Sequence, residues 1–422
     1  MGMEKAIVAT ADRETLIADF QRVRSYTEYL CKPLVTDDYQ IQSIVQTSPP
    51  KWHIAHVTWF FEAFVLPHFK DDYKPFDPNY NFLFNSYYYT HGDLHPRPRR
   101  GLLSRPSVED VYKYRAYVNE KMLELMESVD EGAWADLAFR VTLGLNHEEQ
   151  HQELLLMDIK HNFFVNPLKP SYRNDLVLPQ GETRAMNWVD RKGGIHSIGH
   201  EGCHFGYDNE TPRHKVLIHD HRLADRFITN GEYLDFIKAG GYTNPALWLS
   251  DGWALIQSEQ WQHPLYWEKQ GDQWQQFTLG GVRDLNLYEP VCHISFYEAD
   301  AYARWAGKRL PLEEELETLL EEQSFEDTLA KNDVLHPSPS GQSAQWCGEL
   351  WAWTASPYSA YPGFTPLAGT MGEYNGKFMS NQMVLKGGAC ITPVSHARAS
   401  YRNFFYPEDR WAFTGLRLAE DL

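Results

Sequence analysis

Hydrophobic residues recur three or four positions apart in four segments of the first 165 residues, which places them on one face of a helix in each segment. Ser107 precedes the third segment and is followed by two acidic residues, a pattern typical of a helix N-cap. A stretch rich in Tyr, Asn, Pro and Arg, residues 71–105, separates the second segment from the third. The pattern predicts a four-helix bundle with one long connection. The predicted helices are residues 14–34, 52–69, 108–129 and 134–164.

The pattern changes beyond residue 167, where short strand-like runs alternate with clusters of Gly, Pro, Asn and Asp. Two short helices are predicted in this part, at residues 230–239 and 296–306, and no repeat period is visible. The chain is therefore expected to be an α+β protein of two domains. The expected division is a helical bundle at residues 1–165, a linker at 166–182 and a loop-rich domain at 183–422.

Composition narrows the functional classes. A length of 422 residues suits two domains, and no apolar run approaches the roughly 18 residues that span a membrane. The N-terminus shows no secretion signal, and the five cysteines lack CxxC spacing, which favours a reducing cytosol. A formal net charge of −18 argues against nucleic acid or an anionic membrane as partner. We expect a cytoplasmic protein that acts on small molecules.

The most informative motif is the pentad at residues 147–151, His-Glu-Glu-Gln-His, in the fourth predicted helix. Histidines four positions apart lie one turn apart on the same helix face, where they can hold one metal ion, although such a pair also occurs on plain polar faces. Neighbouring leucines favour a buried position, in which a metal would supply the partner that a buried imidazole needs. His53 and His56 in the second predicted helix are the candidates for a third ligand.

Several segments resemble known families. The bundle with its HxxxH pair resembles a DinB-type metal-binding bundle, and four C-terminal segments resemble the formylglycine-generating-enzyme (sulfatase-modifying factor) fold, a C-type-lectin-like domain. Together, and in this order, they resemble the sulfoxide synthases of ergothioneine biosynthesis and their ovothiol relatives. The C-terminal segments are residues 205–214, 290–311, 351–354 and 387–417.

The chain also departs from neighbouring families. Formylglycine generators use a closely spaced cysteine pair, whereas residues 389–403 contain only Cys390, so we do not expect that chemistry. Ovothiol enzymes typically carry a further methyltransferase domain, which this sequence lacks after residue 422. The second departure is expected to favour the ergothioneine branch over the ovothiol branch.

The resemblance implies a non-haem iron(II) centre with three histidine ligands. His147 and His151 carry over directly, and the family pattern selects His56 as the third ligand, which leaves His53 in a supporting role. The implied reaction consumes O₂ and joins the sulfur of a cysteine-type thiol to C2 of Nα-trimethylhistidine (hercynine), giving a sulfoxide. Neutral imidazole ligands keep the charge of the iron high, so a bound thiol would ionise readily.

The resemblance also implies roles for residues of the long connection. Tyr87 and Tyr88 match a paired-tyrosine segment that supplies the acid–base group in one branch of the family. Arg97 and Arg100 match arginines that hold the carboxylate of the thiol substrate, which favours free cysteine over γ-glutamylcysteine. On the residues alone, these would be packed aromatics and solvated surface charge.

A betaine substrate requires groups that accept a quaternary ammonium and a carboxylate. Phe404 and Phe405 match the C-terminal substrate loop of the family and could flank the trimethylammonium or the thiol, because ring faces attract cations. Asn403 and Gln150 could bond the carboxylate of the betaine. Core packing is the alternative for the two phenylalanines.

Other readings stay open at this point. The pentad formally fits the HExxH motif of zinc metalloproteases, with Glu148 as general base, but no further histidine follows it in a recognised register. The lectin-like half could instead bind a ligand without catalysis. Within the superfamily, γ-glutamylcysteine, histidine or a selenium donor could replace the expected substrates.

Overall fold

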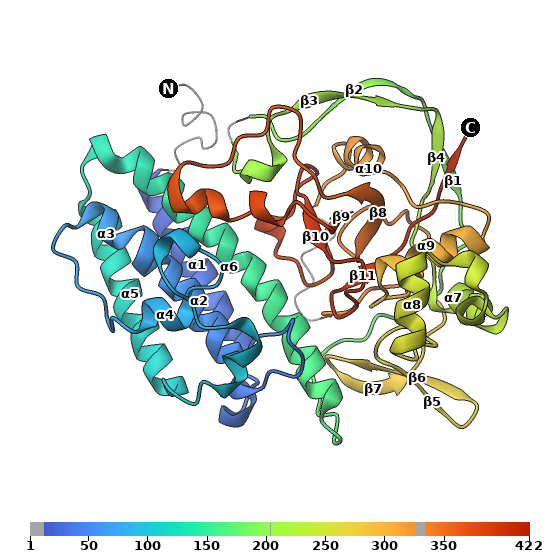
Figure 1. The fold of residues 1–422 in the computed structure, drawn as a ribbon, viewed down its shortest axis with the longest axis horizontal. Helices are drawn as coiled ribbons and strands as arrows, with labels where there is room; N and C mark the ends of the chain where they lie inside the picture. The colour runs from blue at the N-terminus through green and yellow to red at the C-terminus, as the bar shows by residue number, and fades with distance from the viewer. Residues whose placement is uncertain (1–11, 203, 326–333) are drawn as a thin grey trace. The chain divides into compact units, whose positions relative to one another are not determined.

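The computed structural model describes residues 12–202, 204–325 and 334–422, and these divide into two compact units (Figure 1). The first unit runs to Val165 and includes 202–206 and 366–374, and the remaining described residues form the second. Helices dominate the first unit, and the second mixes strands and helices, so the predicted α+β fold of two parts is confirmed. The N-terminal segment, where no secretion signal is expected, lies outside the described residues up to position 11.

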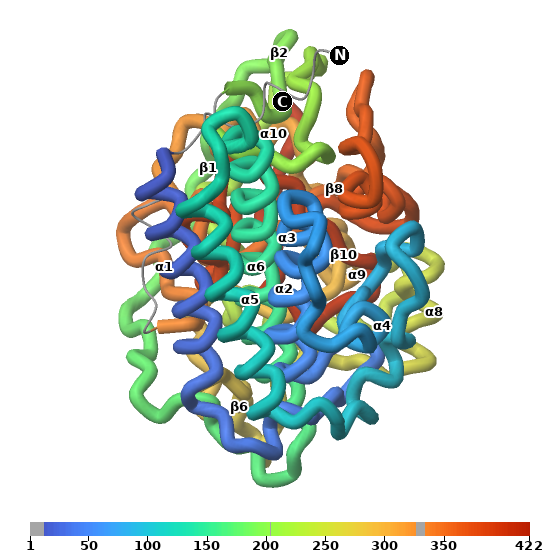
Figure 2. The backbone as a smooth tube through the Cα atoms, turned by 90° about the vertical axis from the view of Figure 1, so that its left-hand side faces the viewer, coloured from blue at the N-terminus to red at the C-terminus, as the bar shows by residue number. Residues whose placement is uncertain are grey.

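Four long helices form the first unit, as the hydrophobic pattern predicts. They run alongside one another, with α2 against both α5 and α6, and α1 against α6 (Figure 2). Ser107 caps α5, because its Oγ accepts from the backbone N–H of Asp110, whose side chain accepts from the Ser107 N–H in return. The long helices are α1 (Arg13–Cys31), α2 (Pro50–Phe64), α5 (Val108–Ser128) and α6 (Glu131–Val165).

The connection after α2 differs from the prediction. The second helix was expected to continue to residue 69, but it ends at Phe64 and a short helix, α3 (Leu66–Phe69), follows. Pro67 lies in the first turn of α3 and has no N–H to bond back into α2, so the helix breaks there. The segment expected to be irregular contains one further turn of α-helix, α4 (Tyr80–Phe84), and the 3₁₀ helix η3 (Arg97–Leu102).

The second unit contains four small sheets with the strand orders β1-β4-β12, β10-β9-β8-β11, β2-β3 and β5-β6-β7. All neighbouring strands are antiparallel except β8 and β11, which are parallel. The strands are β1 (Trp188–Arg191), β2 (Gly194–Ile198), β3 (His214–Ile218), β4 (His221–Ala224), β5 (Trp267–Gln270), β6 (Gln273–Thr278), β7 (Gly281–Asp284), β8 (Trp351–Pro357), β9 (Met383–Lys386), β10 (Asn403–Phe405), β11 (Thr414–Gly415) and β12 (Ala419–Asp421).

The two helices predicted in this unit are present as α7 (Asn230–Lys238) and α9 (Phe296–Trp305). Two more, α8 (Ser250–Ser258) and α10 (Glu313–Leu320), were not predicted. Each spans only two turns and begins with residues that also occur in turns or on acidic surfaces, so the sequence carries little helical periodicity there. Among the described residues, no helix is long and apolar enough to cross a membrane.

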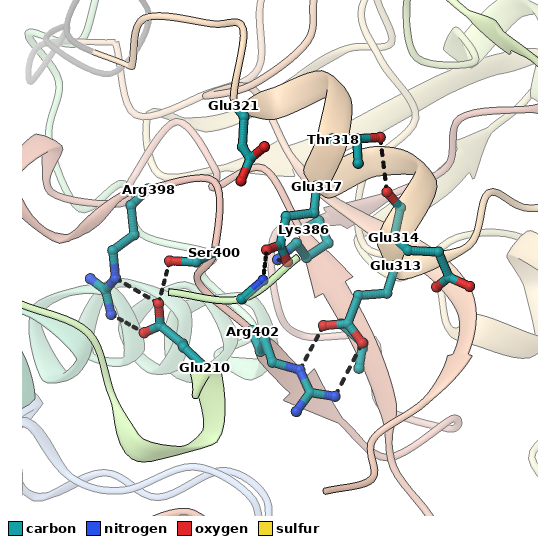
Figure 3. Close-up of polar contacts among 12 residues, drawn as sticks. Glu210, Glu313, Glu314, Glu317, Thr318, Glu321, Lys386, Arg398, Ser400 and Arg402 are labelled. Carbon is teal, nitrogen blue, oxygen red and sulfur yellow. Dashed lines mark hydrogen bonds and ion pairs between the residues drawn. The ribbon is translucent and has the colours of Figure 1, made fainter. Parts of the chain in front are cut away.

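Three ion pairs lie near one another in the second unit (Figure 3). Two are buried and involve α10, which they join to β9 and to the residue before β10, and the third is partly buried and joins a loop to the 3₁₀ helix Asp208–Glu210. In what we call the ion-pair cluster, Arg402 bonds Glu313 at 2.6 Å, Lys386 bonds Glu317 at 2.8 Å, and Arg398 bonds Glu210. Burial alone would raise the pKa of Glu313, but the charges of Arg402 and Lys386 hold it below its ordinary value. Each carboxylate therefore has a cation of its own.

Candidate metal centre

Three histidine side chains from two helices converge in the core of the first unit. His56 projects from α2, and His147 and His151 lie one turn apart on α6. One ring nitrogen from each histidine lies within 4.8 Å of the others, and Nε2 of His56 is 3.2 Å from Nε2 of His147. The helices α2 and α6 pack directly on each other, so two stretches about ninety residues apart in sequence supply one cluster. These three residues are the ligand set that the sequence predicts.

The ring of His56 is fixed on every side. Its Nδ1 donates to the backbone carbonyl of Phe84 at 2.6 Å, and the ring stacks between Trp52 and Trp59 with centroid distances of 4.5 and 5.5 Å. A carbonyl oxygen can only accept a hydrogen bond, so Nδ1 carries the proton and Nε2 keeps its lone pair. That lone pair is directed at Nε2 of His147, 3.2 Å away.

The three imidazoles are neutral. Burial lowers the pKa of all three, and lowers that of His147 to about 3. The neighbouring histidines lower the pKa of His56 and His151 further, because two imidazolium ions would repel at this distance. Metal binding needs the neutral form, so burial prepares the cluster for a cation. Three imidazole nitrogens without an acidic ligand among them suit a borderline divalent metal ion such as iron(II) or zinc.

Glu148 follows His147 directly but lies in a different environment. Its carboxylate accepts hydrogen bonds from Arg24 at 2.7 Å and from Arg115 and Thr27 at 2.6 Å. Burial would raise its pKa, yet the two arginines lower it to about 2. Because both oxygens are held by cations and a hydroxyl, Glu148 does not fit the general-base role that a zinc metalloprotease would give it.

Arg100 is a buried cation close to the histidines. Its guanidinium carbon lies 3.3 Å from the centre of the Trp52 ring, the same ring that stacks on His56. It donates to the hydroxyls of Ser48 and Ser86, both at 2.9 Å, and makes no ion pair with any described residue. Burial and the charge of Arg97 lower the pKa of Arg100 more than the charge of Asp158 raises it, so a further anion at this place would be stabilising. Arg97 itself is exposed and donates to the backbone of Gln46.

Tyr88 lies buried beside the same aromatic group. Its ring centroid is 4.8 Å from Phe64, 5.7 Å from Trp59 and 4.7 Å from Tyr87. Burial raises the pKa of Tyr87, so its hydroxyl stays protonated at neutral pH. Tyr89 is 70% exposed, which separates it from the two tyrosines that the sequence analysis selects.

One residue at this centre was not anticipated. The segment 366–374 belongs to the first unit, and its Tyr374 ring lies 5.5 Å from His147 and 6.2 Å from Tyr87. Glu373 beside it accepts from the backbone N–H groups of Tyr89 and Thr90. More than two hundred residues separate Tyr374 from His147, and no local motif signals the contact.

Comparison with known proteins agrees with this architecture. Residues 19–155 match the DinB superfamily, and residues 174–322 and 321–422 match the sulfatase-modifying factor enzyme 1-like domain. The hercynine oxygenase of Mycolicibacterium smegmatis is 30% identical over 97% of this chain and 99% of its own. That of Mycobacterium tuberculosis is 31% identical over 89% of this chain and 91% of its own. This chain belongs to the hercynine oxygenase family.

The resemblance inferred from the sequence motifs is therefore confirmed. A further relative, ergothioneine biosynthesis protein 1 of Schizosaccharomyces pombe, is 30% identical over 54% of this chain and 29% of its own length. In this chain the DinB region precedes the sulfatase-modifying factor domain. Cys31 is a free, buried cysteine, and Cys203 lies outside the described residues.

The remaining predicted substrate-binding residues lie on α6 and on β10. Gln150 is on α6 between the two ligand histidines and is partly exposed. Asn403, Phe404 and Phe405 form β10 in the second unit, partly exposed in each case. Phe404 stacks on Tyr358 at 4.1 Å, so one of its faces is covered by a ring. His56, His147, His151, Arg100, Tyr87 and Tyr88 are thus gathered in the first unit, and the β10 residues belong to the second.

Proposed function

We propose that the protein is a non-haem, iron(II)- and O₂-dependent sulfoxide synthase of ergothioneine biosynthesis. It would join the sulfur of cysteine to C2 of Nα-trimethylhistidine. The S–H and C2–H bonds break, a C–S bond forms, one oxygen atom of O₂ enters the sulfoxide, and the other leaves as water with the two protons. The observation that carries the proposal is the cluster of three neutral histidines in a chain related over nearly its whole length to hercynine oxygenases.

His56, His147 and His151 would hold the iron, which supplies the activation of dioxygen and of the thiol when it is bound. Oxygen-activating iron sites usually combine two histidines with one carboxylate. Here the acidic neighbour, Glu148, is held by Arg24 and Arg115, so the chain offers a third imidazole instead. Ligands without charge leave the positive charge of the metal uncompensated and favour a thiolate over a thiol beside it.

Arg100 would bind the carboxylate of the thiol substrate, with Arg97 assisting at the surface. Arg100 is buried without an ion pair among the described residues, and a guanidinium fork matches a carboxylate in two parallel hydrogen bonds. Its stack on Trp52, which also stacks on His56, links this anion site to the metal centre. Arg97 and Arg100 match arginines that hold this carboxylate in one branch of the family, which favours cysteine over γ-glutamylcysteine.

Tyr87 and Tyr88 would supply the acid–base group of the reaction. The raised pKa of Tyr87 keeps its hydroxyl protonated, so it is suited to donate a proton or a hydrogen bond to a developing anion. The family resemblance makes Gln150 on α6 a candidate for binding the betaine carboxylate and, independently, makes the β10 residues Asn403, Phe404 and Phe405 candidates for recognising the betaine. A trimethylammonium group cannot donate a hydrogen bond, and the faces of phenylalanine rings attract it. We place the enzyme in the cytoplasm, where a reducing environment suits both iron(II) and a thiol.

An oxygen-electrode assay with anaerobically loaded iron(II) enzyme tests the proposal. Cysteine with trimethylhistidine should give O₂ uptake and a sulfoxide whose mass equals the two substrates plus one oxygen atom minus two hydrogen atoms. γ-Glutamylcysteine or plain histidine should give much slower uptake. Turnover with zinc but not iron, or no thiol-dependent O₂ uptake in any combination, would refute the proposal. Faster uptake with γ-glutamylcysteine would keep the reaction class and change the substrate.

A further inference from the structure

Two side chains connect a buried carboxylate to one of the metal-binding histidines. Asp158 lies on α6 about two turns beyond His151, and its Oδ2 is 2.9 Å from Nε2 of His53 on α2. Nδ1 of His53 is in turn 2.8 Å from Nδ1 of His151. Both His53 and Asp158 are almost fully buried, at 3% and 2% exposure. The three groups form a continuous carboxylate–imidazole–imidazole chain that ends at the metal centre.

Hydrogen-bond chemistry allows this chain one direction. A carboxylate only accepts, so Nε2 of His53 must carry the proton, and Nδ1 of His53 then has a lone pair. That lone pair accepts a hydrogen bond from Nδ1–H of His151, which leaves the lone pair of His151 on Nε2. The backbone N–H of Ser48 also donates to Oδ2 of Asp158, at 2.7 Å, so this oxygen is held as an acceptor.

The three ligands are oriented in different ways. His56 donates to a backbone carbonyl, which no substitution removes, and Nδ1 of His147 has no hydrogen-bond partner among the described residues. Of the three, His151 is the one whose Nδ1 is hydrogen-bonded to an exchangeable side chain, that of His53. Outer partners of this kind determine the tautomer, the ring orientation and the basicity of a ligating histidine.

We infer that Asp158 and His53 are positioning residues that hold His151 in the tautomer that ligates the metal through Nε2. The inference rests on the proposed metal centre and extends it to a residue, Asp158, that the sequence motifs do not single out. It also makes the order of action explicit: Asp158 acts on His53, and His53 acts on His151. A change at Asp158 can therefore affect the metal only while His53 is present.

The test measures cobalt(II) affinity by competition with a chelator, using cobalt as a redox-stable substitute for iron(II). Asp158→Leu and His53→Ala should each raise the dissociation constant about ten- to a hundredfold, the usual effect of losing an outer partner. All three ligands remain, so metal content at saturation should stay near that of the parent. The double variant should be no weaker than His53→Ala alone.

The matched control is Asp158→Asn. Its amide oxygen can take the place of Oδ2 and accept from both Ser48 and His53, so affinity should stay within a few-fold of the parent. Equal affinity for Asp158→Leu and the parent, or additive losses in the double variant, would overturn the inference. If the parent enzyme bound no cobalt, and His147→Ala showed the same absence of binding, the result would instead refute the proposed metal centre.

A second measurement needs no destabilising substitution. In metal-free enzyme labelled with ¹⁵N-histidine, long-range proton–nitrogen spectra distinguish the two neutral tautomers. His53 should carry its proton on Nε2 and His151 on Nδ1, with each signal assigned through the His53→Ala and Asp158→Asn spectra. A proton on Nε2 of His151 in the parent would overturn the inference even if Asp158→Leu failed to fold.

Discussion

The two units of the molecule contain buried polar clusters of opposite character. In the ion-pair cluster of the second unit, Glu313 meets Arg402, and Glu317 meets Lys386, so each buried charge is balanced (Figure 3). In the metal centre of the first unit, the histidines are kept neutral by burial, and the nearby cation Arg100 makes no ion pair with a described residue. A balanced cluster stabilises the fold and offers little to a ligand, whereas an unbalanced one leaves lone pairs and charge for a ligand to use.

The same contrast occurs across a single helix. His147 directs its Nε2 at Nε2 of His56, 3.2 Å away, and its neighbour Glu148 is saturated by two arginines. Residue type alone does not separate the two roles, because both side chains are buried and polar. The number of partners that each side chain has within the protein does separate them.

The largest effect is expected from the ligand histidines. His56→Ala, His147→Ala or His151→Ala should each abolish iron binding and activity, because a site with three protein ligands has none to spare. His53→Ala should keep iron content near that of the parent at saturating metal. Metal analysis after anaerobic loading measures this. Full occupancy in any of the three ligand variants, or loss in His53→Ala alone, would contradict the assignment.

The ion-pair cluster should respond in stability and leave the metal unaffected. Glu317→Leu strands the Lys386 charge in a site where both side chains are fully buried, and should cost about 3–5 kcal/mol of the free energy of unfolding. Removing both charges, with Glu317→Leu and Lys386→Met together, should restore most of that loss. Urea unfolding gives the stability, and cobalt titration of the folded protein gives the affinity. A weaker metal affinity in folded Glu317→Leu would contradict the claim that the ion-pair cluster acts on stability alone.

Substitution of Arg100 should weaken the binding of one substrate, cysteine. Arg100→Leu should raise KM for cysteine about ten- to a hundredfold, which corresponds to roughly 1.5–3 kcal/mol for a charge-assisted contact, and should change that for trimethylhistidine much less. Arg97→Leu should have a smaller effect, since Arg97 is exposed. The matched control is Arg99→Leu, an exposed arginine of the same 3₁₀ helix. If steady-state kinetics showed that Arg99→Leu raises KM for cysteine as much as Arg100→Leu does, the effect would come from the net charge of the protein and not from a contact made by Arg100.

The smallest effect is expected from pH. The lowered pKa values mean that the folded histidines are already without protons, with His147 protonated only near pH 3. Cobalt affinity should therefore change little between pH 7.5 and 5.5, whereas a ligand with an ordinary pKa of about 6.5 would weaken binding about tenfold over that range. Stability should nevertheless depend on pH: the unfolded chain takes up protons that the folded histidines do not, so the free energy of unfolding should fall as the pH drops below about 6.5. A tenfold loss of affinity per histidine would show that the cluster is exposed to solvent.

The features of the fold that depend on local sequence pattern could be predicted from the sequence. The long helices, the cap at Ser107 and the HxxxH spacing follow from periodicity and from the chemistry of single residues. The break at Pro67 was readable from the proline but was missed, because the apolar pattern continues through it. The short helices α8 and α10 carry too few turns for a periodic signal.

The parts of the site that were missed depend on distant contacts. Asp158 and Tyr374 come close to the metal centre only after the bundle has packed, and neither lies in a motif. The choice of His56 over His53 came from the family pattern and not from spacing. The structure supplies a physical account of it, because His53 is engaged by Asp158 and His151 while Nε2 of His56 faces His147.

X-ray absorption at the iron edge tests the central claim most directly. Iron(II) enzyme should show the multiple scattering of imidazole ligands, and addition of cysteine under anaerobic conditions should add a sulfur neighbour. His56→Ala, treated in the same way, should give the spectrum of unbound iron. A parent spectrum without imidazole scattering, or one that cysteine leaves unchanged, would contradict the claim that these three histidines form the centre at which the thiol reacts.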